Sequence, residues 1–236
     1  MQLAKLNGLT QAEMYRVNGQ LVAEPSPIFM ASYTSDFDDD VNGIVGTAQG
    51  GTYIYTGANK TPFATGAQQS VFGGDAGDAV TYPASTSWDI GDDEFTAEAW
   101  VFAVGSAAIA KVIFTNCALV ANTGWVLYQY GTQLTGGVGA VAAGAATGLT
   151  TLAWHHVALV RRYDGATSKI RIYRDGIGGT EVSGGANTPS GSVLTVGCDS
   201  ALAADRPFYG CIAQPTLWRT AKWTANFTPP TAPYTV

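Results

Sequence analysis

From residue 28 onward, apolar and polar side chains alternate along short runs, which clusters of Gly, Asn, Asp and Ser separate. Alternation with a period of two is typical of β-strands that bury one face. Helical periodicity is nearly absent, and the spacing of the runs favours an all-β sandwich over alternating strands and helices. The predicted strands cover residues 52–56, 71–72, 79–82, 95–104, 111–117, 124–130, 134–138, 154–163, 168–174, 193–198 and 208–218.

Two regions show the alternation most clearly. Along 95–103, Phe95 and every second residue after it are apolar and face one way, whereas Glu98, Trp100 and Phe102 face the other. Residues 154–163 and 168–174 flank a turn at 164–167 and predict a hairpin. The core side of this hairpin is expected to carry Val157, Leu159, Ile170 and Ile172.

The first 27 residues differ from the rest. Leu3, Leu6 and Leu9 recur at helical spacing, and Pro25 and Pro27 end any regular element there. We interpret 1–27 as an N-terminal arm or docking segment and 28–236 as one sandwich domain. The alternative is a strand and linker that pack on the edge of that domain.

Composition narrows the function classes. Charged residues are 13% of the 236 residues and the net charge is −6, so neither disorder nor a basic nucleic-acid-binding face is expected. No stretch approaches the length of a membrane span, and the N-terminus lacks the apolar region of a signal peptide. The odd count of cysteines predicts buried thiols in a reducing cytoplasm, with a Cys198–Cys211 bridge as the alternative and Cys117 left over.

Several segments together resemble a known family. They are Phe95–Val101, Trp154–Arg161 (WHHVALVR), Lys169–Gly176 with its IYRDG ending, Leu194–Gly197 and Phe208–Ile212. In this order they are similar to the concanavalin A-like lectin/glucanase superfamily, in its laminin-G-like and pentraxin-like branch. That resemblance implies a jelly-roll sandwich of two curved antiparallel sheets. It also implies mainly architectural roles for Trp100, Trp154, His156 and Gly197.

The closing run from Asn226 to Tyr234 looks like variants found in bacteriophage tail and capsid proteins. The resemblance implies a virion protein made in the host cytoplasm, as a capsid decoration protein or a tail-fibre component. Such a protein is expected to be a homo-oligomer, to contact other virion proteins through 1–27 and to bind host surface polysaccharide. The alternative is a cement protein that stabilises the capsid without binding sugar.

Catalysis is not expected. Hydrolytic members of the superfamily carry E-x-D-x-x-E on one strand, and this chain has no such motif: Glu98 is the only acid on its strand. His155 and His156 are neighbours, so on a strand they point to opposite faces and cannot act as one pair. A glycosidase therefore ranks third, behind the lectin and the cement protein.

Aromatic side chains beside polar ones could line a sugar-binding groove, because aromatic faces pack on the CH-rich faces of sugars. Our first candidates lie on one predicted strand: Trp125, Tyr128 and Tyr130. A second strand, which we expect to be its neighbour, carries Lys169, Arg171 and Tyr173 on its outward face. Further candidates are the loop residues Trp88, Asp205 and Arg206. Alternatively, half of these aromatics fill the sandwich interior.

One acidic run resembles the opening of a Ca²⁺ loop. Asp38, Asp40 and Asn42 have the D-x-D-x-N-G spacing, but Gln49 at the twelfth position cannot supply a bidentate carboxylate. The alternative is an Asx-rich turn whose side chains bond their own backbone. A second acidic cluster comprises Asp89, Asp92 and Asp93. Ca²⁺ through the first run remains a hypothesis, and no other cofactor is indicated.

Overall fold

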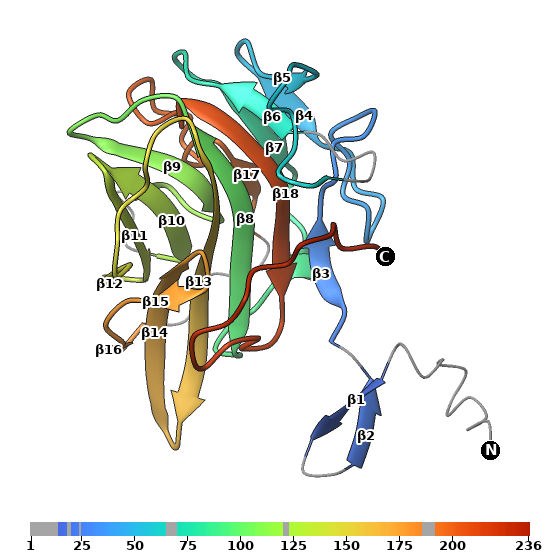
Figure 1. The fold of residues 1–236 in the computed structure, drawn as a ribbon, viewed down its shortest axis with the longest axis vertical. Coiled ribbons are helices and arrows are strands. Elements are labelled where there is room, and N and C mark those ends of the chain that lie inside the picture. The colour runs from blue at the N-terminus through green and yellow to red at the C-terminus, as the bar shows by residue number, and fades with distance from the viewer. Residues whose placement is uncertain (1–13, 18–19, 24, 65–69, 120–122, 186–191) are drawn as a thin grey trace.

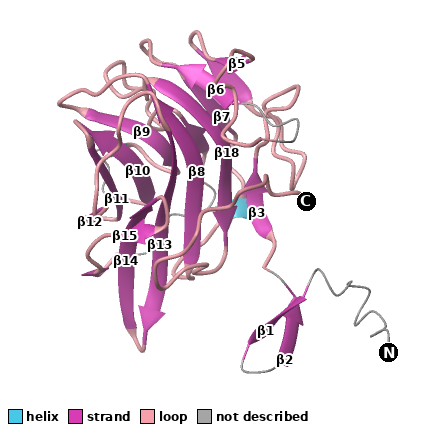
Figure 2. Ribbon diagram, in the orientation of Figure 1, coloured by secondary structure: helices cyan, strands magenta, loops and turns pink. Residues whose placement is uncertain are grey.

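The computed structural model describes residues 14–17, 20–23, 25–64, 70–119, 123–185 and 192–236. Two antiparallel sheets pack face to face, and the strands curve along their length (Figure 1). Strands dominate the described chain, and a short 3-10 helix lies at Thr86–Trp88 (Figure 2). The predicted all-β jelly-roll sandwich is confirmed.

The larger sheet has nine strands in the order β15-β14-β13-β8-β18-β6-β5, with β16 paired to β14 and β3 paired to β18. Its strands are β3 (Pro27–Met30), β5 (Tyr53–Tyr55), β6 (Ser70–Gly73), β8 (Phe95–Ala103), β13 (Trp154–Asp164), β14 (Thr167–Arg174), β15 (Ile177–Gly178), β16 (Val182–Ser183) and β18 (Gly210–Trp218).

The smaller sheet has seven strands in the order β12-β11-β10-β9-β17-β7-β4. They are β4 (Thr47–Gln49), β7 (Ala79–Tyr82), β9 (Ala110–Thr115), β10 (Trp125–Tyr130), β11 (Gln133–Val138), β12 (Val141–Gly144) and β17 (Leu194–Val196). The chain passes repeatedly from one sheet to the other. β6 and β7, which flank a Gly-rich turn in the sequence, therefore belong to different sheets.

The core lies between the two sheets. The residues predicted for the inner side of the β13–β14 hairpin, Val157, Leu159, Ile170 and Ile172, are all fully buried there. Aromatic rings fill the space between them and the opposite sheet; Phe114, for example, meets Trp125 edge to face at 4.8 Å between ring centroids. The alternate apolar residues of both sheets therefore point inward and form one apolar layer between the sheets.

Tight turns follow the residue types expected of them. β13 and β14 pair from Val157 with Arg174 to Asp164 with Thr167, so Gly165 and Ala166 form the predicted turn. At the other end of β14, Asp175 and Gly176 have φ angles of 50° and 78°. A two-residue turn with both residues in the left-handed region joins twisted strands well, and Asp and Gly tolerate that region.

The N-terminal region contributes a separate strand pair. β1 (Met14–Val17) and β2 (Gln20–Ala23) pair with each other and with no other described strand, and they lie apart from the sandwich in Figure 1. The helical spacing at Leu3–Leu9 falls outside the described residues. β3 begins at Pro27, the last residue of the predicted arm, and pairs with β18 of the sandwich.

The three cysteines are free and buried, as predicted, and no bridge joins Cys198 to Cys211. Among the described residues, no helix has the length and apolar character needed to cross a bilayer.

Residues 219–236, which we call the C-terminal strap, lie over the outer face of the nine-stranded sheet. The alternation places Glu98 and Trp100 on this outer face, away from the core, and that placement is correct. The face is nevertheless covered: Trp223 and Phe227 stack at 3.8 Å between ring centroids, and both rings contact His156 edge to face. Glu98 is consequently only 1% exposed.

Candidate functional site

A cleft of about 490 Å³ opens on the outer face of the seven-stranded sheet. Val126, Tyr128 and Tyr130 alternate along β10 and face outward, because Trp125, Leu127 and Gln129 take the inner positions. We call the hollow beside them the tyrosine cleft. Its described lining is completed by Ala108, Ile109, Ala110, Leu119, Gly137, Gly139, Ala140, Val141, Ala142, Asp205 and Arg206.

The cleft exists because small residues stand next to large ones on adjacent strands. Tyr130 is opposite Ala110 on β9, and Val126 is opposite Gly137 on β11. A small or absent side chain beside each large one leaves a hollow in the sheet surface. Tyr130 is 52% exposed, so one face of its ring is open to a ligand.

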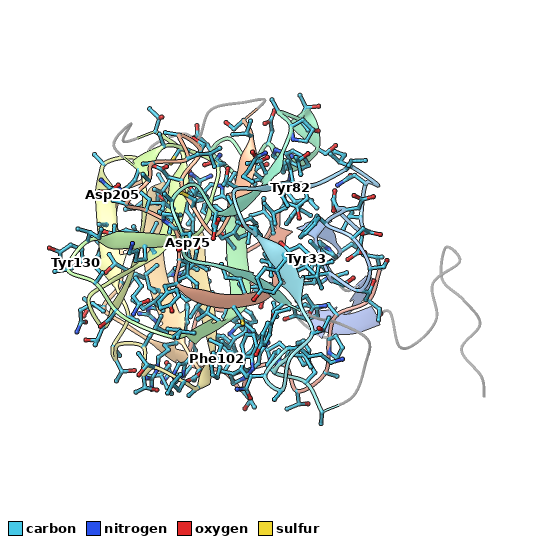
Figure 3. All side chains as sticks on the ribbon, turned by 90° about the horizontal axis from the view of Figure 1, so that it is seen from above. Tyr33, Asp75, Tyr82, Phe102, Tyr130 and Asp205 are labelled. Carbon is cyan, nitrogen blue, oxygen red and sulfur yellow. The ribbon has the colours of Figure 1, made fainter. Side chains whose placement is uncertain are left out.

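Charged groups border the cleft on the loop before β18. Asp205 forms an ion pair with Arg206 at 3.5 Å, and Lys111 on β9 donates to the backbone carbonyl of Asp205 at 2.9 Å. The amide of Val112 bonds to the carbonyl of Arg206, which fixes this loop against β9. Tyr130 and Asp205 lie on the same side of the molecule in Figure 3.

The polar groups of the cleft include both donors and acceptors of hydrogen bonds. Burial raises the pKa of Tyr128 above its ordinary value of 10.0, so its hydroxyl keeps its proton at neutral pH and can donate. The adjacent Asp205 and Arg206 offer an acceptor and several donors. This combination can orient a polyhydroxylated molecule lying on a tyrosine face.

The structure brings together four of the predicted binding residues and separates the others. Tyr128, Tyr130, Asp205 and Arg206 line the same cleft. Trp125, in contrast, is 0% exposed and belongs to the core. Our grouping of Trp125 with the two tyrosines was therefore wrong, since residues five apart on a strand face opposite sides.

The second predicted strand of the groove lies elsewhere. Arg171 and Tyr173 are on β14, in the nine-stranded sheet, whereas β10 is in the seven-stranded sheet. Tyr173 is 1% exposed under the C-terminal strap, and its hydroxyl donates to the carbonyl of Trp223 at 3.3 Å. Arg171 also reaches the strap, at the carbonyl of Thr224, and Lys169 donates to Ser183. Trp88 is buried in the core.

The side chains of the acidic run at 38–42 form hydrogen bonds within the fold. Asp38 accepts from the amide of Gly46, and Asp40 accepts from the amide of Ser32. Asn42 donates through its side-chain nitrogen to the buried Asp39 at 2.6 Å, so that nitrogen points into the cluster. No group of three or more His, Cys, Asp or Glu side chains suited to a metal occurs in the described chain. The run makes the side-chain-to-backbone hydrogen bonds of the Asx-rich turn, and Ca²⁺ binding through Asp38, Asp40 and Asn42 stays a hypothesis.

The second acidic cluster serves packing as well. Buried Arg161 donates to the carbonyls of Gly91 and Asp93, and its guanidinium lies 5.0 Å from the centre of the Phe95 ring. Arg219 forms an ion pair with the Asp93 carboxylate at 3.5 Å. This loop is thereby tied both to β13 and to the C-terminal strap.

The two histidines are held in separate places, as the strand geometry predicts. His155 contacts Asp175 and Thr150, each at 2.7 Å. His156 contacts Glu98 at 2.7 Å under the strap, where Lys222 also reaches Glu98 at 3.0 Å. Because all of these groups are paired inside the fold, we assign them to its stability.

The comparisons with known proteins agree with the architecture. A family model for the concanavalin A-like lectin/glucanases superfamily matches residues 72–225. The chain belongs to this superfamily. A sequence search finds no significant match among curated proteins.

Solved structures show the same fold at low identity. Domain 4 of a GH43 extracellular arabinanase from Geobacillus stearothermophilus, solved with arabinotriose, is 15% identical with a TM-score of 0.59; the match covers 84% of this chain and 94% of that one. The binding domain of botulinum neurotoxin serotype G is 12% identical, also with a TM-score of 0.59. In that case the match covers 83% of this chain and 48% of the other, so the chain spans about half of the toxin domain.

Proposed function

We propose that this protein is a carbohydrate-binding domain whose tyrosine cleft holds a glycan. The observation that carries the proposal is the exposed ring of Tyr130 beside Tyr128, with Asp205 and Arg206 within the same hollow. An aromatic face packs against the CH groups of a sugar ring, while the acid and the guanidinium bond its hydroxyls. The volume of about 490 Å³ falls in the range of small-molecule sites, roughly 300–1,000 Å³.

Two further facts support sugar as the ligand class. The superfamily to which the chain belongs is one of lectins and glucanases. The arabinanase domain with a similar fold was solved in complex with arabinotriose. The same fold hosts many functions, so the proposal rests first on the side chains of the cleft.

We propose binding without hydrolysis. A retaining glycosidase places two carboxylates about 5–5.5 Å apart, and an inverting enzyme about 6.5–9.5 Å apart. Among the described residues that line the tyrosine cleft, Asp205 is the only carboxylate. Glu98 lies under the C-terminal strap on the other sheet and accepts hydrogen bonds from four side chains.

The test is a glycan array probed with the full chain, followed by calorimetry on the sugars that bind. Tyr130→Ala is expected to lower affinity about tenfold, or roughly 1.4 kcal/mol, because the open ring face is lost. Tyr163→Ala is the matched control: this tyrosine is 36% exposed but lies at the end of β13 in the other sheet. The proposal fails if no bacterial or plant polysaccharide binds, or if both variants behave alike.

We further propose that the protein is carried on a bacteriophage particle, as a decoration or fibre component held through residues 1–27. This rests on the likeness of the Asn226–Tyr234 run to phage tail and capsid proteins, and on a β1–β2 pair that joins neither sheet. Homo-oligomerisation would follow from the symmetry of such particles.

Removal of residues 1–25 tests this role and leaves β3 whole. We expect the truncated chain to melt as the full chain does but to be absent from particles imaged by immunogold electron microscopy. Particles still coated by the truncated chain would contradict the docking role. A full chain that coats particles but binds no glycan would instead identify a cement protein.

A further inference from the structure

We propose that the protein binds a neutral polysaccharide along two adjoining clefts, so that the units following those in the tyrosine cleft rest on Tyr209. This inference depends on the proposed glycan binding and specifies the kind of glycan: an extended, uncharged chain. The second cleft encloses about 430 Å³. We call it the Tyr209 cleft; its lining includes Gly74, Asp75, Gly105, Ser106, Lys111 and Tyr209.

Tyr209 is seated as a fixed platform. The residue is 47% exposed, and its ring lies against the backbone of two glycines. A Cβ on Gly74 would overlap the ring, and one on Gly105 would come within 3.2 Å of it. Gly105 does not have the left-handed φ that would itself call for glycine, so the close approach of the ring accounts for glycine at this position. An aromatic ring held in one orientation loses little entropy when a ligand packs on it.

The two clefts are neighbours that share one loop. Ser106 and Ala107 line the Tyr209 cleft, whereas the next residues, Ala108 to Ala110, line the tyrosine cleft. The amide of Gly131, directly after Tyr130, bonds to the carbonyl of Ala107 at 2.7 Å. A second link is the hydrogen bond from Lys111, which lines the Tyr209 cleft, to the carbonyl of Asp205, which lines the tyrosine cleft. A ligand longer than one cleft would therefore continue into the other.

The charges of the linings select against an acidic polymer. Each cleft carries one cation and one anion in its described lining: Arg206 with Asp205 in the first, and Lys111 with Asp75 in the second. The protein as a whole has a net charge of −6. A polyanion would gain nothing from balanced linings and would be repelled by the net charge at low salt. A neutral sugar can use all four groups as donors and acceptors.

The experiment measures affinity against chain length. Ladders of gluco-, xylo- and arabino-oligosaccharides, from disaccharide to octasaccharide, are titrated calorimetrically into wild type, Tyr209→Ala, Tyr209→Phe and Tyr130→Ala. For wild type, affinity is expected to rise with length in the ladder that binds. Tyr209→Ala should bind the shortest bound oligosaccharide as wild type does and lose about tenfold on the longest, while Tyr209→Phe retains the gain.

The outcomes separate this inference from the proposed function. A Tyr209→Ala variant that loses nothing at any length, or loses equally at every length, overturns the two-cleft inference while glycan binding stands. Tighter binding of an oligogalacturonate ladder than of any neutral ladder at low salt overturns the neutral specificity. If wild type binds no ladder and no array glycan, the proposed function itself fails.

Discussion

Replacing Glu98 by alanine is expected to lower the free energy of unfolding by about 3–5 kcal/mol, because it leaves buried cationic and polar groups without their anion. Glu98 lies on β8 and accepts from His156, Trp218, Lys222 and Tyr234. The Lys222 ammonium also lies 3.7 Å from the centre of the Trp218 ring, and the Glu98 side chain to which it is paired is only 1% exposed.

Urea denaturation of the full chain measures this effect. Asp92→Ala is a matched control that removes an exposed carboxylate from the loop just before β8, and it should stay within about 0.5 kcal/mol of wild type. If Glu98→Ala is also within about 1 kcal/mol of wild type, Glu98 does not hold the C-terminal strap to the sheet.

The second large effect is expected from acid. Burial by itself would raise the pKa of Glu98, but the hydrogen bond from His156 and the charge of Lys222 outweigh it and hold the pKa below its ordinary 4.5. A carboxyl group whose pKa is lower in the folded state stabilises the fold above its unfolded pKa. That stability is lost as the pH falls through the lower, folded value.

The unfolding free energy should therefore decline as the pH is lowered below about 4.5. The carboxyl of Asp175 adds to the decline: burial opposes its ionisation, but the hydrogen bonds from His155 and from the His156 amide, with the charge of Arg174, together outweigh burial and lower its pKa. Urea titrations from neutral pH to pH 3 measure the slope, and Glu98→Gln should flatten it. An equal slope in wild type and Glu98→Gln would contradict the assignment to Glu98.

The sequence predicts the local elements well and the contacts between sheets poorly. β8, β13 and β14 follow from alternation, because each turns one apolar side to the core. Alternation also placed Glu98 opposite that core. It could not show that the strap covers Glu98, because the strap has no periodic pattern of its own.

The candidate site shows the same division. Tyr128 and Tyr130 are on the outer face of β10, but both faces of this strand carry large apolar or aromatic residues, so composition does not distinguish them. Counting alternate positions along β10 from Val126 would have placed Trp125 on the opposite face and excluded it from the candidate site. In contrast, β10 and β14 belong to different sheets because of how the chain crosses between the sheets. No local residue pattern predicts these crossings. Tyr209 stands just before β18, far along the chain from Gly74 and Gly105, against which its ring lies, so its seat is visible only once the chain is folded.

The two outer faces of the sandwich therefore differ in what they leave open. The strap covers the part of the nine-stranded face that holds Glu98 and Tyr173, while the clefts lie on and beside the seven-stranded face. Copies of the chain arrayed in one orientation would direct all of their clefts to the same side. Binding several repeats of one polymer at once then raises the overall strength by roughly 10²–10⁴ with no new contact in any single copy. If each cleft binds one glycan as proposed, weak binding in each copy would be sufficient for firm attachment to a repetitive surface.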